Sequence, residues 1–117
     1  RKPPKRNKSP SHLSFLRALP CLGSGKYPPC DPAHIRYADR RYGKKSTGGG
    51  EKPDDEWAVP LCREEHTLQH SMNEEEYWKL KGIDPLPIAM RLWAISGDVV
   101  DGTRIIRELH RHRPEAE

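Results

Sequence analysis

The sequence has few apolar residues and no hydrophobic run long enough to cross a membrane. No apolar signal-peptide core follows its basic start. Only 33% of the 117 residues are hydrophobic and the mean hydropathy is −0.96, so the chain can support one small domain with a thin core. Domains this lean often use a metal ion for stability. We therefore expect a cytoplasmic protein that makes no membrane contact.

Cysteine is also scarce. Three cysteines, an odd number, exclude a complete disulfide framework and favour a reducing compartment. Cys21, Cys30 and Cys62 are candidates for a structural zinc site, but the paired C-x-x-C spacing is missing. Ser24 stands where a second thiolate would follow Cys21, and Glu65 stands in the equivalent place after Cys62. Buried free thiols are therefore the favoured interpretation.

Acidic residues are missing from the first 30 positions, which carry seven Lys or Arg. Removing those seven charges from the formal net charge of +4 leaves −3 for residues 31–117. The positive charge thus belongs to an N-terminal arm, which we predict to be disordered over residues 1–12. Such an arm suits either phosphate neutralisation or a solvated linker.

Turn and cap signals divide the rest of the chain into short elements. Ser9-Pro10 is a typical helix start, Asn73 with Glu76 forms a capping box, and Gly82 is a helix stop. Inward-facing positions are expected to include Leu68, Tyr77, Trp78, Leu80 and Trp93. The predicted helices cover 11–19, 62–72, 73–82, a segment opening at Asp84-Pro85, and an amphipathic C-terminal segment within 96–117; the predicted strands cover 33–37 and 57–61, with a long Gly- and Lys-rich connection over 42–55.

Histidines provide the candidate chemistry. His66 and His70 are four residues apart in a predicted helix, so both imidazoles can face one divalent cation. His34 lies on the first predicted strand, where it is available as a base. The order strand, loop, strand, helix, with histidines on the first strand and on the helix, is the ββα-metal arrangement.

Several motifs in this order and spacing resemble the HNH-like recombination-enhancement nucleases of phages and prophages. The resemblance spans residues 13–95 and implies an α+β fold, a small ββα-metal (HNH, His-Me finger) core flanked by helices. The motifs that carry it are Asp31-Pro32-Ala33-His34-Ile35-Arg36, Glu51 to Trp57 running into Val59-Pro60-Leu61-Cys62, His66, His70, Asn73-Glu74, Tyr77-Trp78 and Gly82-Ile83-Asp84-Pro85.

The resemblance implies a metal-dependent DNA endonuclease that acts in recombination or repair, with DNA as substrate and a RecA-type recombinase as a possible partner. His34 is then the general base, and His66 and His70 bind one divalent ion, Zn²⁺, Mg²⁺ or Mn²⁺. Arg36 and Lys52 lie in matching segments and are expected to contact substrate phosphates.

Two positions depart from the family pattern. Ala33 stands where many HNH sites have a metal ligand, which leaves Asp31 or Asp39 to supply a carboxylate. We assign Asp31 as the third ligand, although it is out of phase with His34 on a regular strand. The HNH asparagine is not visible, and Asp55 is expected to support the loop in its place by bonding to backbone or to a histidine.

Two other functions fit the same residues. In a non-catalytic zinc-stabilised DNA-binding module, His34, His66 and His70 with one cysteine would close a four-ligand site. In an accessory protein that has lost activity, no metal would bind.

Overall fold

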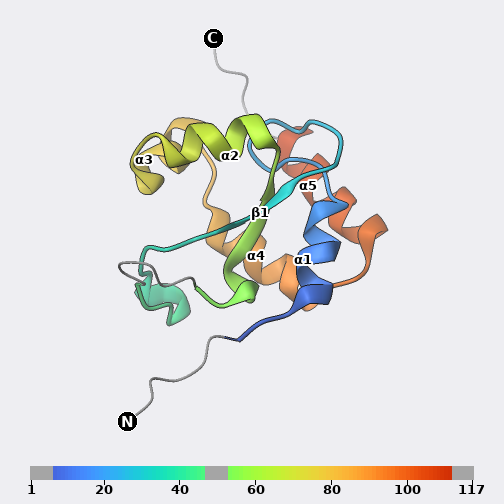
Figure 1. Cartoon of the computed structure of the whole chain (residues 1–117), viewed down its shortest axis with the longest axis horizontal. Coiled ribbons are helices and arrows are strands. Elements are labelled where there is room, and N and C mark those ends of the chain that lie inside the picture. Colours follow the sequence, from blue (N-terminus) through green and yellow to red (C-terminus); the bar gives the residue numbers. More distant parts are fainter. Residues whose placement is uncertain (1–6, 47–52, 112–117) are drawn as a thin grey trace.

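An antiparallel hairpin of two short strands runs through the middle of the molecule (Figure 1). The computed structural model describes residues 7–46 and 53–111. Within these residues the chain forms an α+β domain with five α-helices and one two-stranded sheet. The elements are α1 (Pro10–Arg17), β1 (Asp31–His34), η1 (Arg40–Tyr42), η2 (Asp55–Trp57), β2 (Ala58–Leu61), α2 (Arg63–His70), α3 (Glu74–Lys81), α4 (Pro85–Ala94) and α5 (Val99–Arg111).

The register of the hairpin pairs Asp31 with Leu61 and His34 with Ala58. Pro32 faces Pro60 in the middle of this pairing, at a non-hydrogen-bonded pair where the ladder needs no N–H from either residue. The ladder continues for one more bond, from the Ile35 N–H to the Trp57 carbonyl at 2.8 Å. All four residues of β2 are buried, which makes this strand the centre of the core.

The first strand differs from the predicted 33–37. It begins earlier, at Asp31, and its pairing ends after Ile35. The reason is that the next backbone N–H, that of Arg36, donates to the Glu74 carboxylate at 2.9 Å instead of to a strand. The first strand therefore turns toward α3.

Helix α1 begins at Pro10, inside the arm predicted for residues 1–12. The Ser9 side chain accepts from the His12 N–H, and Pro10 occupies the first helical turn. His12 is fully buried. The predicted helix start at Ser9-Pro10 is confirmed, whereas residues 10–12 do not belong to a disordered arm; residues 1–6 lie outside the described part of the chain.

The caps of α3 and α4 follow their sequence signals. The Asn73 side chain accepts from the Glu76 N–H, Gly82 ends α3 in the left-handed region, and Asp84 caps α4. The inward face of α4 contains Leu86 and Leu92.

Three predicted core residues lie at the surface instead. Leu80 is 70% exposed on the outer side of the short helix α3, and Leu68 of α2 is also exposed. Trp93 is 42% exposed because it lies at the rim of α4, with its ring edge against the buried His12 at 4.8 Å between centroids.

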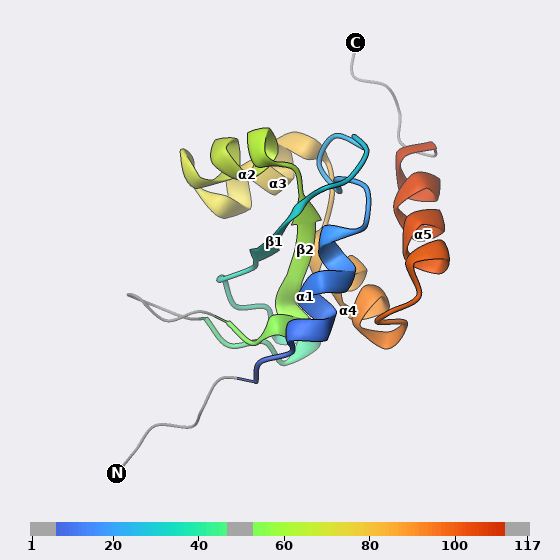
Figure 2. The ribbon, with the colours of Figure 1, turned by 45° about the vertical axis from the view of Figure 1, so that its right-hand side comes forward.

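Helix α5 covers α1 on the side away from the hairpin (Figures 1 and 2). Gly102 permits this close approach, since a Cβ there would lie 2.9 Å from Leu19 and 3.0 Å from Phe15. Ile105 and Ile106 complete the contact from the buried face of α5. Among the described residues, no helix combines the length and the apolar character that a membrane crossing requires.

Candidate active site

A chain of polar contacts connects the start of β1 to helix α2. Pairing with Leu61 places Asp31 beside the first turn of α2, where its carboxylate accepts from His66 Nδ1 at 3.0 Å and from Arg63 at 3.1 Å. One helical turn later, His70 Nε2 lies 3.0 Å from His66 Nε2. The predicted i,i+4 pair is therefore formed, and Asp31 is joined to it.

The hydrogen bond to Asp31 determines which nitrogen of His66 carries the proton. A carboxylate only accepts, so Nδ1 of His66 donates and Nε2 of the neutral ring keeps its lone pair facing His70. Burial, the neighbouring His66 and the charge of Arg36 all lower the pKa of His70. The lowered pKa favours the neutral form of His70, in which the ring can serve as a nitrogen ligand.

The distance between the two ring nitrogens is close to the one that a shared metal ion requires. Two tetrahedral ligands with nitrogen about 2.0–2.1 Å from zinc lie about 3.3–3.4 Å apart, close to the 3.0 Å between the Nε2 atoms of His66 and His70. Asp31 lies on the opposite nitrogen of His66, in the position of a supporting carboxylate rather than of a third ligand. Across residues 7–46 and 53–111, no group of three or more His, Cys, Asp or Glu side chains is arranged to hold a metal.

A second hydrogen-bonded group lies at the other end of β1. His34 Nε2 lies 2.8 Å from one Asp55 oxygen, and the other oxygen accepts from the Ser9 N–H at 2.7 Å. Asp55 is only 2% exposed. The adjacent Asp54 accepts from the Asn7 N–H at 2.8 Å, so the segment before α1 holds the turn that carries Asp55.

Asp55 thereby fixes the orientation of His34. Both of its oxygens accept hydrogen bonds, so His34 Nε2 is the protonated nitrogen and the lone pair of the neutral ring is on Nδ1. The structure thus gives Asp55 both of the partners considered for it from the sequence, a backbone N–H and a histidine. No sequence signal pointed to Ser9 as the donor, because every residue except proline carries a backbone N–H.

The predicted phosphate-binding residues are only partly placed. Arg36 follows β1, and its charge acts on His70. Lys52 lies outside the described residues. Lys44 is buried and donates to the Lys45 carbonyl at 3.1 Å, so its ammonium group is directed into the protein.

The cysteines form a small buried cluster of free thiols. The Ser24 hydroxyl lies 3.8 Å from Cys62 Sγ, and the Ser24 N–H donates to Cys21 at 3.4 Å. The Cys30 thiol forms a hydrogen bond to the Cys21 sulfur. This hydrogen bond, together with burial, raises the pKa of Cys30, so its thiol stays protonated. All three cysteines are thus buried and outside any disulfide, as predicted.

Glu65 has a different role from the one that its spacing after Cys62 suggests. Its carboxylate accepts from the Tyr77 hydroxyl and from Lys81, both at 2.7 Å. It is therefore engaged in tying α2 to α3.

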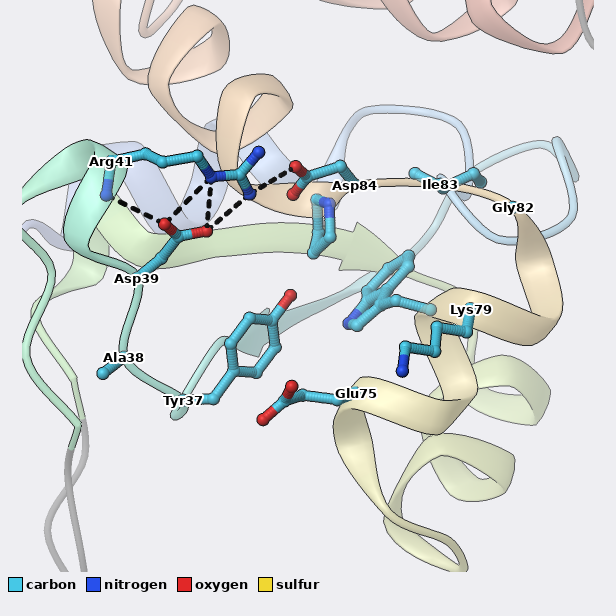
Figure 3. A pocket seen from close by; sticks show the side chains of 11 residues that line it. Tyr37, Ala38, Asp39, Arg41, Glu75, Lys79, Gly82, Ile83 and Asp84 are labelled. Carbon is cyan, nitrogen blue, oxygen red and sulfur yellow. Dashed lines mark hydrogen bonds and ion pairs between the residues drawn. The ribbon is translucent and has the colours of Figure 1, made fainter.

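A pocket that no sequence motif indicated lies between the end of β1, η1, α3 and the start of α4 (Figure 3). Its walls include Tyr37, Trp78 and an ion-paired Arg41. These residues come from separate segments, and only their convergence in the fold creates the cavity.

Comparison of the chain with models of protein families, with curated proteins and with solved structures found no match in any of the three.

Proposed function

We propose that this chain is a metal-dependent DNA endonuclease of the HNH type. The observation that carries the proposal is the pairing of His34 with the buried Asp55 in the same hairpin and helix unit that brings His66 and His70 together. A histidine oriented by a carboxylate can act as a general base, and a pair of imidazoles can bind a divalent ion; metal-assisted phosphodiester hydrolysis uses both.

His34 is the proposed general base. Its Nε2 proton is engaged by Asp55, so the ring accepts a proton from the attacking water at Nδ1. Asp55 stabilises the imidazolium that forms, since its negative charge is held 2.8 Å away in a buried position. General-base assistance of this kind is worth about 10²–10⁴ in rate.

His66 and His70 are the residues that would hold the divalent ion, with Asp31 orienting His66 from behind. A bound ion would polarise the scissile phosphate and stabilise the leaving oxygen. Asp31 keeps the proton of His66 on Nδ1, which leaves Nε2 as the ligand nitrogen. This proposal moves Asp31 from the metal's inner ligands to a supporting role.

The substrate is proposed to be DNA, in a setting of recombination or repair with a RecA-type recombinase as partner. Arg36 supports this, because its positive charge acts on His70 and could neutralise a phosphate bound near that ring. Lys52 remains a proposed phosphate contact on its sequence position alone. A phage or prophage origin and a cytoplasmic location are likewise proposed from the sequence alone.

The zinc-stabilised DNA-binding module gains no specific support from these contacts. It requires His34 to join His66, His70 and a cysteine around one ion, whereas His34 is hydrogen-bonded to Asp55 and the thiols contact one another.

Nicking of supercoiled plasmid in Mg²⁺, Mn²⁺ or Zn²⁺ tests the proposal. We compare the native chain with His34→Ala, His70→Ala and Thr67→Ala; Thr67 is exposed on α2 and is the matched control. Metal-dependent nicking that only the histidine variants lose is expected. Nicking that survives in His34→Ala, or no nicking by the native chain with or without a recombinase filament, would contradict the proposal.

A further inference from the structure

The pocket of Figure 3 has a volume of about 340 Å³. This is near the lower end of the range of about 300–1,000 Å³ in which small-molecule sites fall, so the pocket suits one ring-sized group. It is lined by residues of the segment 37–41, which follows Arg36, and by residues of α3 and the start of α4.

A buried donor without an acceptor lines this pocket. Trp78 is 3% exposed, and within the described residues its indole Nε1 has no hydrogen-bond partner. Buried N–H groups are nearly always paired, because an unpaired one loses its hydration without compensation. The atom is covered in this structure, so a ligand acceptor that displaces the neighbouring side chains would satisfy it.

Tyr37 supplies a second donor and an aromatic surface. Its partial burial, and then the charges of Asp84, Glu74, Glu75 and Asp39, raise the pKa of its hydroxyl, which stays protonated at neutral pH. The carboxylates of Glu75 and Asp84 also line the pocket, where they can accept from N–H groups of a ligand.

The remaining wall is rigid. Arg41 donates to Asp39 at 2.6 Å and to Asp84 at 3.0 Å, which joins η1 to the start of α4 (Figure 3). The guanidinium is thereby neutralised, so Arg41 shapes the pocket instead of attracting an anion. Lys79, on α3 beside Glu75, supplies an ammonium group to the lining.

We propose that this pocket binds one unpaired nucleobase of a single-stranded nucleic acid. A base has a π face for Tyr37, a ring or carbonyl acceptor for the indole N–H, and amino or imino donors for the carboxylates. A base within a duplex is stacked and paired, so it cannot enter. A simple cation would suit the carboxylates but would leave the indole N–H unpaired.

The position of the pocket connects it to the candidate active site. Tyr37 follows Arg36 directly, so a strand whose phosphate contacts Arg36 has a neighbouring base within reach of the pocket. The inference rests on the proposed function only for the choice of DNA as ligand. It does not require that the strand be cut.

Fluorescence anisotropy with EDTA present, so that no cleavage occurs, tests the inference. The probes are a labelled single-stranded 12-mer oligonucleotide and a 12-mer of the same sugar-phosphate chain that carries no bases. The proteins are the native chain, Tyr37→Ala, Trp78→Phe and the matched control Tyr27→Ala, which removes a tyrosine that is 77% exposed and not among the pocket residues. Circular dichroism verifies that each variant is folded.

We expect Tyr37→Ala to weaken binding of the normal oligonucleotide about 5- to 100-fold, the range for loss of base stacking. Trp78→Phe keeps an aromatic face and loses only the donor, for an expected loss of about 2- to 10-fold. Tyr27→Ala should bind like the native protein. The 12-mer that carries no bases should bind all four proteins equally.

Equal binding of the normal oligonucleotide by Tyr37→Ala and Tyr27→Ala would overturn the inference, even if plasmid nicking is normal and the proposed function stands. An effect of Tyr37→Ala on both probes would also overturn it, since the pocket would then not read a base. Displacement of the oligonucleotide by millimolar lysine or methylammonium, but not by deoxynucleoside monophosphates, would overturn it in favour of a cation site. A base-dependent loss in Tyr37→Ala without any nicking would support the pocket and refute the nuclease.

Discussion

Replacing Asp55 with asparagine should move one proton and remove catalysis while the fold survives. Asp55→Asn keeps an oxygen that can accept from the Ser9 N–H, and its new amide N–H can donate to His34 Nε2. His34 must then carry its own proton on Nδ1. The lone pair needed for the general base is lost, and the expected fall in nicking rate is about 10²–10⁴-fold.

The effect on stability separates this substitution from a simple deletion. Asp55→Ala removes both hydrogen bonds to a buried carboxylate, each worth about 1.5–3 kcal/mol. The sum, about 3–6 kcal/mol, is a large part of the stability of a small domain, about 5–15 kcal/mol. Asp55→Asn keeps both contacts but loses their charge, so we expect a loss of about 1–2 kcal/mol.

The assay combines urea unfolding, plasmid nicking and nitrogen NMR of labelled histidine, which distinguishes protonated from unprotonated ring nitrogens. Asp54→Asn is the matched control, because Asp54 is the neighbouring carboxylate and contacts Asn7 instead of His34. Native nicking by Asp55→Asn would refute the reasoning. So would an unchanged proton position on His34.

Three further outcomes are expected. Burial lowers the pKa of His12, against a smaller opposing effect of Asp55. The His12 ring therefore binds a proton more readily in the unfolded chain than in the folded one. The free energy of unfolding should then decrease as the pH falls below about 6.5, by up to about 1.4 kcal/mol per pH unit. Urea titrations across that range check this, and a slope unchanged in His12→Asn would contradict it. Asp31→Asn should weaken binding of Mn²⁺ or Zn²⁺ about 10- to 100-fold by calorimetry, as for other carboxylates behind a metal-binding histidine; equal affinity would exclude that role. Gly102→Val places a Cβ 2.9 Å from Leu19 and should cost about 1–3 kcal/mol by urea unfolding, unless α5 does not pack on α1.

Local signals in the sequence were sufficient for much of the fold. Ser9-Pro10, Asn73 and Gly82 act through bonds within a few residues, so the helix boundaries they predict agree closely with the structure. The i,i+4 contact of His66 and His70 follows from helix geometry alone.

Features that depend on distant residues could not be predicted in the same way. The end of the first strand depends on the hydrogen bond from the Arg36 N–H to Glu74, and the contact of the half-exposed Trp93 with the buried His12 joins two helices far apart in the sequence. The pocket requires Tyr37, Arg41 and Trp78 to converge from three segments. No periodicity or spacing in the sequence predicts these long-range contacts, because each depends on tertiary packing.

The opposed prolines of the hairpin have a consequence for how the site is held in place. Hydrogen-bonded pairs alternate along an antiparallel ladder, and Ile35 with Trp57 is one of them, so Pro32 and Pro60 occupy a pair whose backbone groups point away from the partner strand. The two prolines therefore leave the ladder intact and remove donors only from the outer edges of the hairpin. On the outer edge of β2 the Pro60 carbonyl accepts from the Leu22 N–H at 2.8 Å, which joins the hairpin to the segment after α1, while the Ile35 N–H donates to the Trp57 carbonyl at the end of the ladder. Amide exchange at Leu22 and Ile35 should therefore report on opening of the whole core, and any substitution that loosens α1 should accelerate exchange there and separate His34 from Asp55.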